Sequence, residues 1–234
     1  ISEAFPSTPL IWDACQAHGA EISDDNGIWY SIGDSSPSRE SSISCWSFYA
    51  TKNLTTGEGG MLTTNDDSLA QELRQLRNHG QDERYSYMKL GYNYRMTEMQ
   101  GAIGLVQIDH MAHSSYIRGK IAKAYTEFLR DDGAIVKPHV KSDVVHAWHQ
   151  YTIRVLNGRR DDLKHHLEER DIYPKVYYPT PLHKTKLFLD LGYEESHPNA
   201  EKASREVLSL PVHPGLTQRQ IDHIIRAVNS WHPN

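Results

Sequence analysis

Residues 47–60 read SFYATKNLTTGEGG, a stretch with strand character at its start and a glycine-rich turn at its end. The residues at 44–50 favour a strand, and the turn leads the chain into a further run, MLTT, at 61–64. Lys52 lies between the strand and the turn. A lysine in such a place can be partly desolvated, which lowers the pKa of its amine toward nucleophilic chemistry. Lys52 is therefore the first candidate for a catalytic residue.

A carboxylate is expected beside Lys52. Residues 9–12, PLIW, form a short apolar run that ends at Asp13, a pattern typical of a buried strand with a polar residue at its carboxyl end. If this strand runs parallel to the one at 44–50, Asp13 and Lys52 meet at the edge where α/β sheets bind ligands. A lysine and a buried aspartate are what pyridoxal phosphate requires, the amine as Schiff base and the carboxylate as partner of the pyridinium nitrogen.

The same stretch offers groups for a phosphate. The hydroxyl of Ser47 and the hydroxyl and backbone donors of the turn at 55–60 are candidates. The turn is not a P-loop, because it follows its lysine and lacks the GxxxxGK spacing. The prediction is a phosphate held by a serine and a turn.

The remaining pattern predicts an α/β protein with two parts. Residues 22–44 are polar and indicate an exposed excursion, Asp66 indicates the start of a helix, and Leu69, Leu73 and Leu76 form its apolar stripe. Residues 97–131 are helical in character, with Thr97 as cap and a second helical stretch at 115–129. A smaller α/β unit follows, with a strand at 151–156, a helix at 160–170, a strand at 175–178 and a last helix capped by Thr217.

Composition excludes several classes of protein. The chain has 234 residues and a formal net charge of −5. It contains no run of about 18 apolar residues and no secretion signal at its start, so we expect no membrane span. It has no sustained Lys/Arg run of the kind that binds nucleic acid. Two cysteines, Cys15 and Cys45, are too few for a disulfide framework, and a reducing, cytoplasmic location is expected.

Histidines form short pairs that need a separate interpretation. His146 and His149 make an H-x-x-H, and His165 and His166 are adjacent, but no cysteine or carboxylate stands at ligand spacing, so no metal site is predicted. His149 and His183 are instead candidates for a place near a substrate. The alternative for both is a packed histidine at the end of a strand.

The full strings resemble one family. DACQAHGA at 13–20, SFYATKNLTTGEGG at 47–60 and GYNYRMTE at 91–98 are similar to motifs of the DegT/DnrJ/EryC1/StrS family of sugar aminotransferases. The likeness continues, in order, through YPTPLH at 178–183 and EVLSLP at 206–211. It covers nearly the whole chain, and the string around the lysine is highly specific.

The resemblance implies a cofactor, pyridoxal 5'-phosphate, and a role for individual residues. Lys52 matches the Schiff-base lysine, which also moves the proton between substrate and cofactor, and Asp13 matches the partner of the pyridinium nitrogen. The other matches are Gln16 for the cofactor face or phenolic oxygen, Ser47 for the phosphate, Asn93 for the phosphate of the neighbouring subunit, Arg95 for an anionic substrate group, and His149 and His183 for the substrate.

The resemblance also implies a reaction. Family members aminate a keto sugar, commonly nucleotide-linked, with glutamate or glutamine as donor, and a homodimer would share its active sites across the interface. Relatives that carry histidine in place of the lysine dehydrate the sugar instead, so Lys52 favours transamination over the dehydratase branch. A further alternative is a catalytically incomplete fragment or a regulatory homologue that binds pyridoxal phosphate.

The expected architecture is the aspartate-aminotransferase type, PLP fold type I. Residues 1–110 would form the C-terminal part of the large domain, and residues 111–234 the small α/β domain. Two departures from the family accompany this expectation. The 39 residues from Asp13 to Lys52 (52 − 13) exceed the usual spacing, and the N-terminal portion of the family is missing, which would leave apolar edges of the large sheet exposed.

Overall fold

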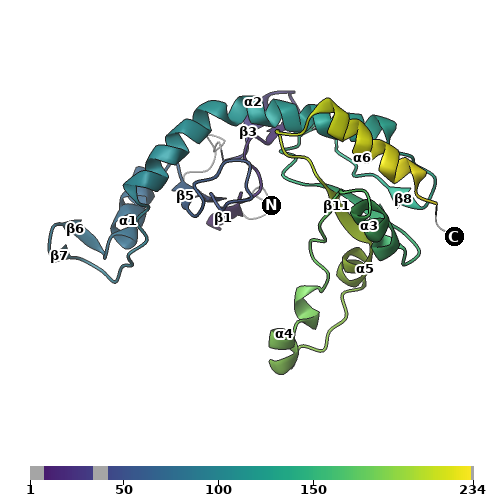
Figure 1. Ribbon diagram of the computed structural model, residues 1–234. Coiled ribbons are helices and arrows are strands. Elements are labelled where there is room, and N and C mark those ends of the chain that lie inside the picture. Colours follow the sequence, from purple (N-terminus) through teal and green to yellow (C-terminus); the bar gives the residue numbers. More distant parts are fainter. Residues whose placement is uncertain (1–7, 34–41, 233–234) are drawn as a thin grey trace. The chain divides into compact units, whose positions relative to one another are not determined.

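The computed structural model describes residues 8–33 and 42–232 (Figure 1), so the serine-rich string at 35–38 lies outside the described residues. The described chain divides into two compact units. The first contains the residues up to Ser115 together with Lys141–His149, and the second contains Tyr116–Val140 and the residues from Gln150 onward. The main chain therefore leaves the first unit, enters the second, and returns once for nine residues.

A three-stranded sheet in the first unit confirms the strands expected around Lys52. Its order is β1 (Leu10–Asp13), β4 (Ser42–Ser47) and β5 (Gly60–Thr63). β1 and β4 are parallel, with Asp13 opposite Cys45, and β5 runs antiparallel to β4. β1 is more exposed than predicted, with Ile11 75% exposed, because among the described strands it pairs with β4 alone.

The expected excursion at 22–44 contains structure that the sequence interpretation missed. β2 (Glu21–Ser23) pairs with β3 (Trp29–Ser31) and, on its other side, with β9 (Val144–Val145). Asp24 closes the hairpin, because its Oδ1 accepts hydrogen bonds from the backbone N–H groups of Asn26 and Ile28, each at 2.9 Å. A carboxylate that caps its own turn thus replaces the predicted exposed excursion in the described part of this stretch.

The helix expected after Asp66 is confirmed as α1 (Asp67–Arg77), and Oδ1 of Asp66 accepts from the N–H of Leu69 at 3.0 Å. A small hairpin of β6 (Gln81–Glu83) and β7 (Ser86–Tyr87) follows it. Gly80 is required there, because its φ is +71° and a Cβ would lie 1.8 Å from the carbonyl oxygen of Lys89. The segment from β6 to Arg95 presents tyrosines, a methionine and a leucine to the exterior.

One continuous helix, α2 (Glu98–Phe128), replaces the two helical stretches expected at 97–131. Thr97 caps it as predicted, its Oγ1 accepting from the N–H of Gln100 at 3.3 Å. The part within the first unit exposes Met99, Leu105 and Val106, whereas the part within the second unit buries Ile121 and Tyr125. The helix is thus a core element of the second unit only. No helix within the described ranges combines the length and apolar character that crossing a membrane requires.

The second unit is an antiparallel sheet with helices. The strand order is β11 (Val207–Leu210), β10 (Tyr151–Val155) and β8 (Ile135–Val136). The remaining elements of this unit are the helices α3 (Arg160–Glu168), α4 (Lys186–Asp190), α5 (Pro198–Glu206) and α6 (Gln218–Ser230), and a 3₁₀ turn at Leu182–Lys184. The predicted cap of the last helix is confirmed as a capping box of Thr217 and Gln220. In Figure 1, α6 runs beside the end of α2, where Nδ2 of Asn229 donates to the carbonyl of Phe128.

The strand expected at 175–178 is wrong. Only Lys175 pairs, in an isolated bridge to Ser209 whose two backbone hydrogen bonds are 3.0 and 2.8 Å long. Pro174 and Pro179 flank the segment, and a proline lacks the N–H that would extend the ladder. The pairing therefore stops at one residue.

The buried hydroxyl of Tyr125 gives a test of this packing. It donates to the carbonyl of Pro211 at 2.7 Å, and burial raises its pKa. We expect Tyr125→Phe to lower the free energy of unfolding by about 1 to 2 kcal/mol, because the buried carbonyl loses its donor. Urea unfolding followed by circular dichroism measures this. Tyr193→Phe, at an exposed site in the same unit, is the control, and an equal effect in both variants would contradict the assignment.

Candidate functional site

The candidate site lies at the carboxyl edge of the parallel pair in the first unit. Asp13 is the last residue of β1, and Ser47 is the last residue of β4. The N–H of Ala14 donates to the carbonyl of Cys45 at 2.9 Å, so the parallel register continues to the end of both strands. Lys52 follows β4 by five residues, and its positive charge lowers the pKa of Asp13. Cys15 is the larger cause of that shift, and within the described residues no hydrogen bond or ion pair joins the side chains of Asp13 and Lys52, so their shared role at this edge stays a prediction.

Asp13 is exposed rather than buried as expected, because β1 pairs with β4 alone among the described strands. Its Oδ1 accepts from the N–H of Cys15 at 3.1 Å. Hydrogen bonds from the side chain and the backbone of Cys15, followed by the charge of Lys52, hold the pKa of Asp13 below its ordinary value. Asp13 is therefore an anion at neutral pH, as a partner for a protonated ring nitrogen must be. Burial raises the pKa of the Cys15 thiol, which keeps it protonated and neutral.

The turn that carries Lys52 is closed by its own backbone. The N–H of Lys52 donates to the carbonyl of Tyr49 at 2.9 Å, and the N–H of Phe48 donates to that of Gly59 at 2.8 Å. The hydroxyls of Thr55 and Thr56 donate to backbone carbonyls at 3.1 and 2.7 Å. These two hydroxyls stabilise the turn, which corrects the expectation that they are free for a phosphate.

Ser47 keeps its hydroxyl at the strand end. Its side chain is half-buried, and its Oγ accepts from the N–H of Tyr49 at 3.3 Å, which leaves the O–H as a donor. Gln16 is exposed and lies in a turn in which the N–H of Ala17 donates to the carbonyl of Ala14, rather than one helical turn after Asp13. Both residues belong to the same edge as Asp13.

His18 is a feature of this site that the sequence analysis missed. It is 4% exposed, and its ring packs against those of Trp46 and Phe48, with centroids 5.3 and 6.0 Å away. Burial, and then the charge of Lys52, lower its pKa, so the imidazole is neutral at neutral pH. The position of His18 in the sequence gives no pattern that marks it as part of the site. Its packing against Trp46 of β4 reveals its place there.

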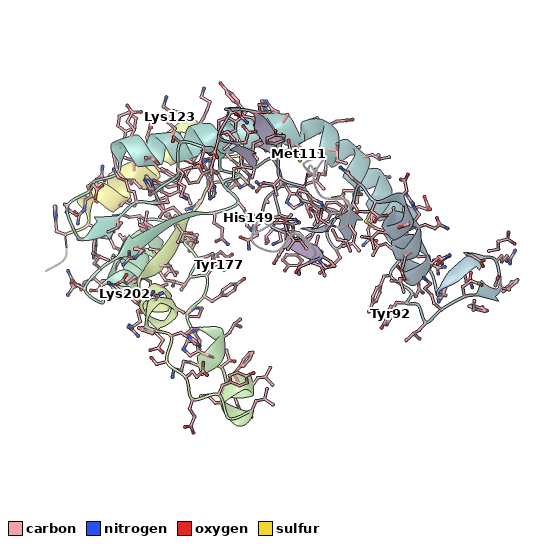
Figure 2. All side chains as sticks on the ribbon, turned by 180° about the vertical axis from the view of Figure 1, so that it is seen from behind. Tyr92, Met111, Lys123, His149, Tyr177 and Lys202 are labelled. Carbon is pink, nitrogen blue, oxygen red and sulfur yellow. The ribbon has the colours of Figure 1, made fainter. Side chains whose placement is uncertain are left out.

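His149 belongs to the same unit as Lys52, although it is far from Lys52 in sequence. It ends the returning segment 141–149 and is labelled in Figure 2. Asn53, the neighbour of Lys52, donates from Nδ2 to the carbonyl of Ala147 at 2.7 Å. The segment that carries His149 is therefore tied to the lysine turn, and its role at a substrate stays a prediction.

Asn93 and Arg95 lie on a different part of the first unit. Asn93 is exposed between Tyr92 and Tyr94, whose rings stack with centroids 4.9 Å apart and planes 4° apart. Arg95 donates to Oδ1 of Asn78 at 3.0 Å. Within the described residues, no hydrogen bond or ion pair joins this segment to Asp13 or Lys52, and its role at a neighbouring subunit stays a prediction.

His183 is held inside the second unit. It is 9% exposed, its Nε2 lies 3.1 Å from Oε1 of Glu201, and its ring meets that of His197 edge to face at 4.6 Å. Glu201 also accepts from the Oγ of Ser196 and the N–H of His197, each at 3.1 Å. The ring nitrogen that faces Glu201 is therefore engaged in packing, in agreement with the alternative of a packed histidine. Across residues 8–33 and 42–232, no group of three or more His, Cys, Asp or Glu side chains could hold a metal ion.

A pocket lies in the second unit, at the end of α2. It has a volume of about 390 Å³, and Lys120, Lys123, Phe128 and Ile221 contribute to its walls. Neither Asp13 nor Lys52 lines it, so the strand edge remains the candidate site.

Glu201 gives a pH-dependent test. The hydrogen bond from His183, with those from Ser196 and His197, lowers the pKa of Glu201 from 4.5 to about 2. Its contribution to stability is therefore complete above about pH 4.5 and is lost as the pH falls through about 2. We expect the unfolding free energy of Glu201→Gln to fall less steeply with acid over this interval than that of the parent protein. Urea titrations across the interval, with Glu194→Gln as an exposed control, measure the slopes; parallel slopes for parent and Glu201→Gln would contradict the assignment.

The geometry and the fold define a class of protein. Over 98% of this chain, the structure superposes with a TM-score of 0.88 on a crystal structure of S. venezuelae DesV in complex with a ketimine intermediate, at 35% identity, and covers 59% of that chain. This likeness confirms the expected α/β fold of type I. The chain belongs to the DegT/DnrJ/EryC1/StrS aminotransferase family, whose sequence model matches residues 6–229.

Two curated relatives show the range of the family. A protein of Geobacillus stearothermophilus named pleiotropic regulatory protein is 39% identical over 95% of this chain and 58% of its own length. The dTDP-3-amino-3,4,6-trideoxy-alpha-D-glucose transaminase of Streptomyces venezuelae is 36% identical over 95% of this chain and 56% of its own length. The chain thus spans somewhat more than half the length of these relatives.

Proposed function

We propose that this protein is a pyridoxal phosphate-dependent aminotransferase that converts a keto sugar, linked to a nucleotide, into an amino sugar, with glutamate or glutamine as donor. The observation that carries the proposal is the ionised Asp13 at the carboxyl edge of the parallel strands, whose pKa is lowered first by Cys15 and last by the charge of Lys52. Membership of an aminotransferase family and the name of the dTDP-sugar transaminase relative support the reaction class and the substrate class. The first unit would be the cofactor-binding domain and the second unit the small domain.

The chemistry of the donor set fits pyridoxal phosphate. The Asp13 carboxylate is anionic and would pair with the protonated ring nitrogen, Ser47 would donate its hydroxyl to the phosphate, and Lys52 would hold the aldehyde carbon. Gln16, on the same edge, would contact the ring face or its phenolic oxygen. When bound, the cofactor supplies an electron sink for transfer of an amino group.

Lys52 would also move the proton that transamination requires. Its Nζ is the base that takes the proton from the carbon bearing the donor's amino group, and it returns a proton during amination of the sugar. At this strand edge Asp13 is anionic and His18 is neutral at neutral pH. Because a histidine would stand here in the dehydratase branch, the lysine favours transamination.

A homodimer would complete the site. Asn93, exposed between two stacked tyrosines, would reach the cofactor phosphate of the neighbouring subunit, and Arg95 would anchor an anionic part of the substrate. The exposed apolar side chains of α2 in the first unit, among them Met99 and Leu105, support such an interface because exposed apolar patches of this kind are usually covered by a partner. A cytoplasmic location accords with the two free cysteines.

A second candidate is a regulatory homologue that binds the cofactor without turnover. The observation that favours it is the name of the Geobacillus stearothermophilus relative, a pleiotropic regulatory protein at 39% identity. This candidate retains cofactor binding at Lys52 and lacks amino transfer. An assay with a keto-sugar nucleotide and glutamate therefore distinguishes the two candidates, because the aminotransferase forms the amino sugar and the regulatory homologue does not.

Removal of the lysine amine tests the proposal. We expect Lys52→Ala to lose the visible absorbance that pyridoxal phosphate gives when a lysine holds it, and to lose turnover by on the order of a thousandfold or more. Absorption spectra with added cofactor and assays with glutamate and keto-sugar nucleotides measure both. Lys202→Ala, at an exposed site on α5, should retain them. A Lys52→Ala protein with the parent spectrum and turnover would exclude the proposal, and a parent protein with the spectrum but no turnover would favour the regulatory homologue.

Mixed subunits test the shared site. Lys52→Ala and Asn93→Ala should each be inactive alone, because each lacks one half of every site. After subunit exchange, about a quarter of the sites regain both residues if each site takes Lys52 from one subunit and Asn93 from the other. Activity measured after mixing at equal concentrations gives the answer. Recovery would support the dimer, whereas activity no higher than that of the separate variants would contradict it.

A further inference from the structure

We propose that Asn53 is a positioning residue, whose side-chain amide ties the returning segment 141–149 to the lysine turn and so sets the environment of Lys52. The inference about Lys52 as cofactor residue rests on the proposed function. The tie itself does not, because it is a contact between two parts of the first unit. The two can therefore be tested apart.

The contact is specific in its geometry. Nδ2 of Asn53 lies 2.7 Å from the carbonyl oxygen of Ala147, a residue that is 5% exposed. The other amide atom of Asn53, Oδ1, is buried and has no hydrogen-bond partner among the described residues. A reversed amide would place Oδ1 against the carbonyl of Ala147, two acceptors facing each other, so the N–H donor is the group that the site selects.

The segment reaches both halves of the candidate site. At its start, β9 pairs with β2, and the N–H of Ser23 donates to the carbonyl of Asp143 at 2.9 Å. β2 belongs to the stretch that begins with Asp13, whereas Asn53 directly follows Lys52. A segment from the second half of the sequence thus connects the carboxylate stretch with the amine stretch, and Asn53 makes the connection on the amine side.

The turn at 146–148 needs this support. Trp148 has a φ of +45°, in the left-handed region that is unfavourable for a bulky side chain. Its N–H donates to Nδ1 of His146 at 2.9 Å, and the two rings lie with centroids 4.4 Å apart. Ala147, in the middle of the turn, is the residue that Asn53 holds. The hydrogen bond therefore acts on the residue directly before one with an unfavourable backbone conformation.

The hydrogen bond of Asn53 to Ala147 also affects Lys52, the residue that precedes Asn53 in the chain. Lys52 is half-buried, its N–H is bonded to Tyr49, and the next residues in the chain are Asn53 and the buried Leu54. Release of Asn53 removes one of the side-chain hydrogen bonds of the residues after Lys52, the others being those of Thr55 and Thr56. The amine can then shift relative to the carboxylate of Asp13, which changes the surroundings of the bond that Lys52 would make to the cofactor.

The first experiment measures the tie without cofactor. Asn53→Ala removes the donor without adding a charge, and Asn65→Ala changes an exposed asparagine of the same unit. We expect hydrogen–deuterium exchange of peptides covering 143–150 to be about tenfold faster in Asn53→Ala than in the parent protein or in Asn65→Ala. Equal exchange in all three proteins would overturn the proposal.

The second experiment measures the consequence for Lys52. In protein reconstituted with pyridoxal phosphate, the pH midpoint of the visible absorbance should differ between Asn53→Ala and the parent, while Asn65→Ala keeps the parent midpoint. Faster exchange at 143–150 with an unchanged midpoint would make the bond a stabilising contact only and would overturn the positioning role. If the parent protein shows no such absorbance, the proposed function fails, and exchange of peptides covering 51–54 then decides whether Asn53 orders the lysine turn.

Discussion

The parallel pairing of β1 with β4 is the constraint on which the candidate site depends. Asp13 lies opposite Cys45, and the backbone bond from Ala14 to Cys45 carries the register to the end of both strands. Because parallel strands end at the same edge, Asp13 and the turn that carries Lys52, 39 residues further along the chain (52 − 13), follow strand ends at that edge. A slip by one residue would turn Asp13 to the opposite face of the sheet.

The charges at this edge are mutually consistent. Asp13 is an anion because Cys15 and Lys52 lower its pKa, whereas Cys15 and His18 are neutral because burial works against their charged forms. An anionic Asp13 suits a cofactor with a protonated ring nitrogen, and the returning segment 141–149 contacts the first unit through the pairing of β9 with β2 and the hydrogen bond from Asn53.

Much of the local structure was predictable, because its causes are local. Asp66 and Thr217 cap helices through side chains that reach only three residues ahead. The strand at 175–178 failed because alternation alone does not reveal whether a partner strand continues, and the flanking prolines end the ladder after Lys175. The hairpin of β2 and β3 was missed because its polar composition hides the turn that Asp24 closes.

The sequence by itself determined the residue types at the strand edge, the helix caps and the resemblance to one family, because each is written in a short run of neighbouring residues. Tertiary structure alone decided that Asp13 is exposed at the end of β1, that His18 is buried behind β4, that His183 is engaged by Glu201, and that Asn53 holds Ala147. These contacts join residues distant in sequence, and their energies depend on burial and on hydrogen-bond geometry. Burial and hydrogen-bond geometry are properties of the folded chain, so the sequence alone does not give them.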